Sequence, residues 1–130
     1  MPIHTTPDHQ QHLLHTRCTD IVSVDEVCVY LKTTWLDPAV YGYNQLIDYT
    51  AADLSQIDYG GLMTIAAESA KVYSLDPDSR CAMLIASAEQ KRMADFYINA
   101  KSLMTVPTRE YKSFTCREEA IEWLTEKHST

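Results

Sequence analysis

Apolar residues in this chain follow two patterns: short continuous runs, and longer stretches in which they recur every three or four positions. The run CAMLIAS at residues 81–87 is typical of a strand covered on both faces of a sheet. Weaker runs at 11–18, 45–49 and 111–114 predict three more strands. Because strands alternate with helical patterns, we predict a single-domain α/β fold with a four-stranded, mostly parallel sheet and about four helices.

The first two helices are predicted from the residues that cap them. Ser23 and Glu26 form an S-x-x-E capping box, and Pro38 ends the helical pattern that follows. Asp58 is suited to cap a second helix that runs to about Tyr73. The residues expected to face the core are Val24, Val27, Cys28, Leu31 and Trp35 in the first helix, and Leu62, Ile65, Ala66, Ser69 and Tyr73 in the second.

The last two helices carry similar signals. Ser87 and Gln90 predict a capping box for the third helix, which Pro107 closes. Thr115 and Glu118 predict another box for the fourth. The residues expected on the apolar faces are Met93, Phe96, Tyr97, Ala100, Leu103 and Met104 in the third helix, and Ala120, Ile121, Trp123 and Leu124 in the fourth.

Residues 1–10 are polar and contain two prolines, so we predict a flexible N-terminal arm before a domain at 11–130. His9, His12 and His15 are spaced by three, whereas helical zinc ligands usually pair at i and i+4. A solvated, histidine-rich arm is therefore favoured over a metal site, and no cofactor is expected.

The formal net charge is −7, which argues against nucleic acid as a partner because phosphate binding needs clustered Lys and Arg. The charge is uneven: residues 1–79 carry eleven acidic and three basic side chains, and residues 80–130 carry seven and eight. A solvated surface explains this, and charge-driven docking of a partner is the alternative.

The four cysteines, Cys18, Cys28, Cys81 and Cys116, form no C-x-x-C pair, so zinc or redox chemistry is not indicated. Free cysteines in apolar runs favour a reducing, cytoplasmic setting. The N-terminus lacks a secretory signal pattern, and no apolar run approaches the ~20 residues that span a bilayer. We therefore expect no membrane contact.

No hydrolase elbow, zinc-protease, Walker or dinucleotide motif is present. Asp48 stands at the end of a predicted strand, Asp58 at a helix start and Ser87 after the next strand, which would bring them to the carboxyl edge of the sheet. Asp48 and Asp58 could form a carboxylate pair, but local roles in a turn and a cap explain them better. An enzyme is not predicted.

Gly60 and Gly61 lie in the first turn of the second predicted helix. They would let a group approach the backbone amides of the helix N-terminus, which favours anions, although Asp58 would repel an anion. Close packing or a partner-recognition surface explains them equally well. Arg92 is either a solvated side chain or a pocket arginine that acts with Tyr97.

The order of several motifs resembles the STAS fold, and more narrowly the small bacterial proteins called STAS-like. These motifs are Leu46-Ile47-Asp48, D-Y-G-G-L at 58–62, the "dP…Y" linker with Asp37, Pro38 and Tyr41, Arg80 before the CAMLIAS strand, Arg92-Met93, and F-x-x-x-E-E-A-I-E-W-L at 114–124. The resemblance covers about residues 12–126. It implies a small sheet with helices largely on one side, and a role as a binding module.

In anti-sigma-factor antagonists with this fold, the corresponding helix starts D-S-S-G-L, and a kinase phosphorylates the second serine. Gly60 stands at that position here, and Tyr59 stands at the position of the first serine. The resemblance therefore implies the fold but not the phosphorylation switch.

Two functions remain open. The chain is either a cytoplasmic regulatory module that docks a protein partner or a second copy, or a protein that binds an apolar or anionic small molecule. An exposed apolar patch at Tyr59, Leu62 and Met63 would favour docking. A pocket lined by Asp48, Arg92 and Tyr97 would favour a ligand.

Overall fold

A computed structural model describes residues 3–34, 37–40, 42–73, 79–103 and 109–126. Its five-stranded sheet keeps the strands in chain order, β1 to β5. The strands are Ile3–Asp8, Leu13–Ile21, Asn44–Asp53, Arg80–Leu84 and Glu110–Phe114. β1 is antiparallel to β2, and every other neighbouring pair is parallel. The predicted α/β class and the mostly parallel sheet are confirmed.

The first strand is the main correction to the predicted fold. Residues 3–8, predicted as a flexible arm, pair with β2 from Ile3 opposite Cys18 to Asp8 opposite Leu13. Pro7 fits because an edge strand tolerates a residue without an N–H group. The Asp8 carboxylate accepts bonds from the amides of Gln10 and Gln11 in the turn that follows. The sheet consequently has five strands and not four.

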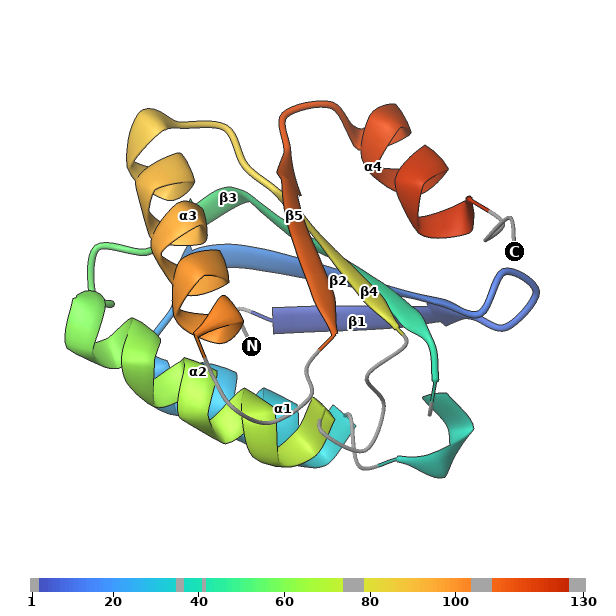
Figure 1. The fold of residues 1–130 in the computed structure, drawn as a ribbon, viewed down its shortest axis with the longest axis horizontal. Coiled ribbons are helices and arrows are strands. Elements are labelled where there is room, and N and C mark those ends of the chain that lie inside the picture. Colours follow the sequence, from blue (N-terminus) through green and yellow to red (C-terminus); the bar gives the residue numbers. More distant parts are fainter. Residues whose placement is uncertain (1–2, 35–36, 41, 74–78, 104–108, 127–130) are drawn as a thin grey trace.

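Helices cover both faces of the sheet (Figure 1). α1 (Val24–Thr34), α2 (Tyr59–Tyr73) and α3 (Ala88–Ser102) lie on one face, and α4 (Arg117–Thr125) lies on the other. A short 3-10 helix, Pro38–Val40, precedes β3. On β4, Cys81 and Met83 join the core of the three-helix face, whereas Ala82 and Leu84 join the core beneath α4. This alternation accounts for the uninterrupted apolar run in the sequence.

Three of the four predicted helix caps are present in the structure. Ser23 and Glu26 form the reciprocal pair of bonds of a capping box. Asp58 caps α2 by accepting a bond from the Gly61 amide at 2.7 Å. Ser87 caps α3, although the Gln90 side chain bonds elsewhere.

The capping box predicted at Thr115 and Glu118 is wrong. Cys116 occupies the N-cap of α4, and its side chain makes no capping bond. Leu103, predicted on an apolar face, caps the C-terminus of α3 and is 84% exposed. Trp35, Tyr41, Met104, Pro107 and the side chain of Tyr73 lie outside the described part of the chain.

Gly61 lies where α1 and α2 approach each other closely. A Cβ atom at this position would come within 2.7 Å of Val24 Cγ2 on α1, whereas one on Gly60 would meet only the Asp58 carboxylate at 3.5 Å. Close packing therefore explains Gly61. The same account does not extend to Gly60, which has room for a side chain.

Candidate functional site

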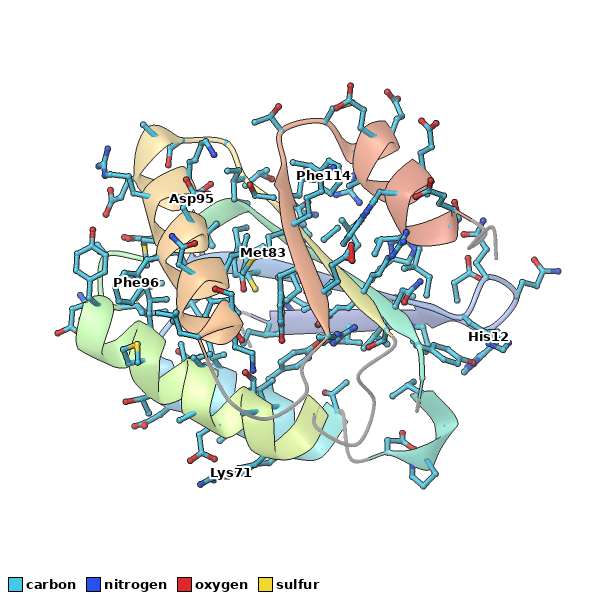
Figure 2. All side chains as sticks on the ribbon, viewed as in Figure 1. His12, Lys71, Met83, Asp95, Phe96 and Phe114 are labelled. Atoms are coloured by element: carbon cyan, nitrogen blue, oxygen red, sulfur yellow. The ribbon has the colours of Figure 1, made fainter. Side chains whose placement is uncertain are left out.

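A cavity of about 70 Å³ lies between the sheet and helices α1, α2 and α3. Its wall is largely apolar, and all three helices contribute to it through Leu31, Leu62, Ile65, Met93 and Ala94. The strands complete the wall with Ile3, Ile47, Tyr49 and Met83. Figure 2 shows Met83 in the region between α3 and the sheet. An apolar hollow with few polar groups is the usual form of a small-molecule site.

One group of polar side chains in the wall is joined in a buried network. Thr16 Oγ1 and Tyr30 OH lie 2.6 Å apart. Gln45, which is 1% exposed, donates from Nε2 to Thr16 Oγ1 at 3.3 Å and also to Tyr30 OH. Its Oε1 accepts a bond from Nη1 of Arg109 at 3.3 Å. These bonds supply the partners that buried polar atoms need.

A second polar group lies behind another part of the wall. Tyr97 lines the cavity, and its OH lies 2.9 Å from Ser69 Oγ. Lys101 Nζ donates to that Ser69 oxygen at 2.8 Å and to the Ala66 carbonyl at 3.4 Å. The Lys101 nitrogen also lies 5.8 Å from the ring centre of Tyr111, another wall residue.

Burial changes the acid–base behaviour of these groups. Lys101 is 1% exposed, and desolvation together with the nearby Arg109 charge lowers its pKa from 10.5 to about 8. Desolvation raises the pKa of Tyr97 to about 12 and that of Cys81 to about 11. At neutral pH the lysine is therefore charged, while the phenol and the thiol keep their protons.

Arg109 is the second buried cation of this region, at 1% exposure. It holds together the ends of β3 and β4 by donating from Nη2 to the carbonyls of Tyr43 at 3.3 Å and Arg80 at 3.0 Å. Its bond to Gln45 extends the contact to the cavity wall.

The predicted position of Asp48 is wrong. β3 continues to Asp53, so Asp48 lies inside the strand, not at its carboxyl end. Its side chain is on the α4 face, where it pairs with Arg117 and accepts bonds from Thr50. Asp58 caps α2 on the opposite face, so the two carboxylates have separate local roles.

The predicted pocket of Asp48, Arg92 and Tyr97 does not form. Tyr97 lines the observed cavity, but Arg92 is exposed and neither it nor Asp48 belongs to the wall. Ser87 is an exposed cap residue.

Tyr59, Gly60 and Gly61 begin α2 at the surface. Tyr59 is 55% exposed and packs on Phe96 of α3, with ring centres 4.6 Å apart. Figure 2 places Phe96 on α3 near the beginning of α2. Met63 is 47% exposed, whereas Leu62 is buried and lines the cavity. The first turn of α2 therefore has both an exposed apolar side and a side that faces the cavity.

The fold of this chain is also found in a solved structure. The chain is similar to a crystal structure described as an uncharacterised protein of the DUF3478 family with a SpoIIAA-like fold, from Shewanella loihica PV-4. The TM-score is 0.57 at 19% identity, with 94% of this chain and 91% of that chain covered. This chain has a SpoIIAA-like, and hence STAS-like, fold. No protein-family model and no curated protein matches the sequence.

The sequence interpretation missed most residues of the site. Lys101 could have been found, because it continues the i, i+4 series of Met93 and Tyr97 on the buried side of α3. Gln45 could have been suspected from its place in an apolar strand, whereas Arg109 carries no sequence signal of burial. Within the described ranges, no group of His, Cys, Asp or Glu is arranged to hold a metal ion, and no helix is long and apolar enough to cross a membrane.

Proposed function

We propose that this protein is a non-enzymatic binding module that holds a small apolar molecule in the cavity between the sheet and helices α1 to α3. The observation that carries the proposal is the cavity itself, with apolar side chains from three helices around a few hydrogen-bonded polar groups. The STAS-like fold supports a binding role, because the resemblance implies one.

The size of the cavity limits the ligand. Its 70 Å³ is less than the volume of an engineered apolar cavity of about 150 Å³ that takes up benzene. Even a single ring or a short alkyl chain would therefore need the helices to shift, and this is the largest class of ligand that we propose. A long lipid chain would require the helices to separate.

Ligand-induced thermal stabilisation tests this function. A molecule that binds only the folded state raises the melting temperature, and the rise grows with the ratio of its concentration to its Kd. Benzene and 1-hexanol should stabilise the wild type, and the effect should vanish in Ala94→Met, which fills the cavity from α3. Ala67→Met, at an exposed position of α2, is the matched control and should respond like the wild type. Equal responses in both variants, or none in the wild type, would exclude the cavity as the site.

A second candidate function is the docking of a protein partner or a second copy. The observation that favours it is the exposed apolar surface of Tyr59 and Met63 beside Phe96. Light scattering after size exclusion, with native mass spectrometry of the same peak, distinguishes the two functions. A dimer without added mass that dissociates in Met63→Asp would support docking, and a monomer with a bound small molecule would support the cavity.

The cellular setting belongs to the same proposal. We infer a reducing, cytoplasmic environment, supported by the unpaired thiols of Cys18, Cys28, Cys81 and Cys116. Neither nucleic acid nor a membrane is proposed as a partner, since the net charge of −7 disfavours polyanions and anionic surfaces.

A further inference from the structure

β1 is the part of the cavity wall that is held by the sheet on one side only. It is an edge strand, and β2 is the strand that it pairs with. Ile3 of β1 lines the cavity and is half-buried. It lies opposite Cys18, and Thr5 lies opposite Thr16, and both partners on β2 are buried wall residues. The first half of β1 therefore bounds the cavity at this edge of the sheet.

The two ends of β1 are anchored differently. The turn after its Asp8 end is fixed to the start of β3: the ring of His12 stacks on that of Tyr43, and the Asn44 amide donates to the His12 carbonyl at 3.1 Å. Figure 2 labels His12 in this turn. Along the rest of the strand, the side-chain bond to β2 within the described ranges is a long one, 3.4 Å between the hydroxyls of Thr5 and Thr16. The turn is thus the fixed end of β1.

The other elements of the wall are tied more firmly. Tyr30 attaches α1 to β2, because its hydroxyl lies 2.6 Å from Thr16 Oγ1. Gln90 attaches α3 to β3 by donating from Nε2 to the Tyr49 carbonyl at 2.9 Å. α2 packs closely on α1 at Gly61. The central strands have a neighbouring strand on each side.

A ligand can enter the cavity only when part of the wall moves. Every residue of the wall is buried or half-buried. The cavity of about 70 Å³ must also expand to hold a ring. Local opening of a protein begins in segments with few buried contacts and few bonds to the rest of the fold. β1 is the segment of this wall that meets that description.

Resting on the proposed function, we propose that β1 is an entrance flap, whose Ile3 end swings away from β2 and α1 about the turn at residues 9–12. Opening the flap uncovers the cavity beside Thr16 and Cys18 and gives it room to expand. The rest of the sheet stays in place, because β2 keeps its parallel pairing with β3. When the flap closes, Ile3 packs against the bound ligand.

A reversible covalent lock is the first test of the flap. His4 and Arg17 are exposed and lie opposite each other in the β1–β2 register. Because successive side chains of a strand point to opposite faces, both lie on the face away from the cavity. Opposite residues of an antiparallel pair have Cα atoms about 4.5–5.5 Å apart, which suits a disulfide. The double variant His4→Cys/Arg17→Cys therefore joins β1 to β2 without altering the wall.

Fluorine NMR of fluorobenzene measures how fast a single-ring ligand exchanges between the free and bound states. In the oxidised double variant this exchange should be about tenfold slower or more than in the wild type, because β1 cannot open. Reduction of the same sample should restore the wild-type rate without changing the Kd. Peptide mass mapping checks that the new disulfide joins positions 4 and 17 and does not involve Cys18.

A pair of matched variants gives a second test that needs no disulfide. Ile3 and Ile47 are both half-buried wall residues, but Ile3 is on the edge strand and Ile47 on a central one. Ile3→Ala should raise the association rate of fluorobenzene severalfold, because the flap loses packing that holds it closed. Ile47→Ala removes the same atoms and should leave this rate close to that of the wild type.

The outcomes separate the flap from the cavity function. If fluorobenzene binds and exchanges equally fast in the oxidised and reduced double variant, the ligand enters elsewhere and the flap is excluded, while the cavity function stands. Equal association rates in Ile3→Ala and Ile47→Ala would also exclude it. If fluorobenzene, benzene and 1-hexanol all fail to bind the wild type, the cavity function itself fails.

Discussion

Gln45 and Lys101 are polar side chains in an apolar interior, and their neighbours decide what each can do. Gln45 uses both ends of its amide, with Arg109 on one side and the hydroxyls of Thr16 and Tyr30 on the other. It is therefore a satisfied core residue. Lys101 has its hydrogen bonds but no acidic partner among the described residues, so its buried charge lowers the stability of the folded state.

The first residue-scale prediction concerns the pH dependence of stability. Burial lowers the pKa of Lys101 in the folded state from 10.5 to about 8. Between these values the unfolded chain binds more protons, so this group makes the free energy of unfolding rise with pH. Below pH 8 its destabilising effect is constant. Lys101→Met should therefore have a free energy of unfolding about 1–3 kcal/mol higher than that of the wild type at pH 7. Denaturant titrations should show this difference decreasing between pH 8 and 10.5. A difference that does not vary with pH would mean that Lys101 titrates normally.

A second residue-scale prediction uses the two neighbouring glycines. Gly61→Ala should lower the free energy of unfolding by about 1–3 kcal/mol, because the new Cβ would collide with the stiff side chain of Val24. Gly60→Ala is the matched control. It should leave stability unchanged or raise it by up to about 1 kcal/mol, since alanine is the better helix former. Urea denaturation of both variants measures the contrast, and similar losses in the two would contradict the packing of α1 against α2.

At the scale of elements, the two faces of the sheet have different contents. α4 covers a small apolar cluster with Leu46, Leu84, Ala120 and Leu124, whereas the other face holds three helices and the cavity. Asp48 lies on the α4 face and pairs with Arg117 at the start of that helix. α4 therefore belongs to the scaffold, and we expect changes in it to affect stability more than binding.

The element-scale prediction tests how α4 is attached. Trp123 is half-buried. Its ring packs against Phe114 in a tilted arrangement, with ring centres 5.6 Å apart, and lies 5.0 Å from the Arg80 guanidinium. Trp123→Ala should lower the free energy of unfolding by about 2–4 kcal/mol through lost packing and the lost cation–π contact. Glu122→Ala, on the exposed side of the same helix, should change it by less than about 0.5 kcal/mol. A loss below about 1 kcal/mol for Trp123→Ala would mean that the helix is held mainly by its other contacts.

The elements themselves were largely predictable, because hydrophobic period and helix caps are local signals. The CAMLIAS run and the caps at Ser23, Asp58 and Ser87 were identified correctly. β1 was missed because the polar sequence of residues 3–8 carries no signal of a strand. Its pairing with β2 is what holds it in the sheet. The sequence from Thr115 to Glu118 matches the pattern of a capping box, yet the N-cap of α4 is Cys116, one residue later. A four-residue motif can therefore match without forming the cap.

The site was less predictable, because it depends on which side chains the fold turns inward. Asp48 and Arg92 are polar residues that sequence alone placed in a pocket. Asp48 lies on the α4 face of β3 and Arg92 on the exposed side of α3, so neither joins Tyr97 in the cavity wall. Lys101 was overlooked because lysine is normally exposed. Residue type alone pointed to Asp48 and Arg92, which do not line the cavity. The apolar period of α3, in contrast, includes the buried position of Lys101.

At the scale of the whole molecule, the cavity connects the elements that a ligand would stabilise. Its wall draws on α1, α2, α3 and the sheet, and α4 contributes nothing to it. A ligand in this position holds the three helices against the sheet, so their local opening should become rarer. The opposite face has no reason to respond, since its contacts are with α4.

Hydrogen exchange can detect this asymmetry. At short exchange times, where local opening dominates, a saturating concentration of 1-hexanol should slow exchange in α2 and α3 and leave α4 unchanged. Ala94→Met should show no ligand-dependent protection, because its cavity is filled. Mass spectrometry of peptides from each helix gives the measurement. Protection confined to the first turn of α2, at Tyr59 and Met63, would instead place the ligand on the exposed surface and favour the docking function over the cavity.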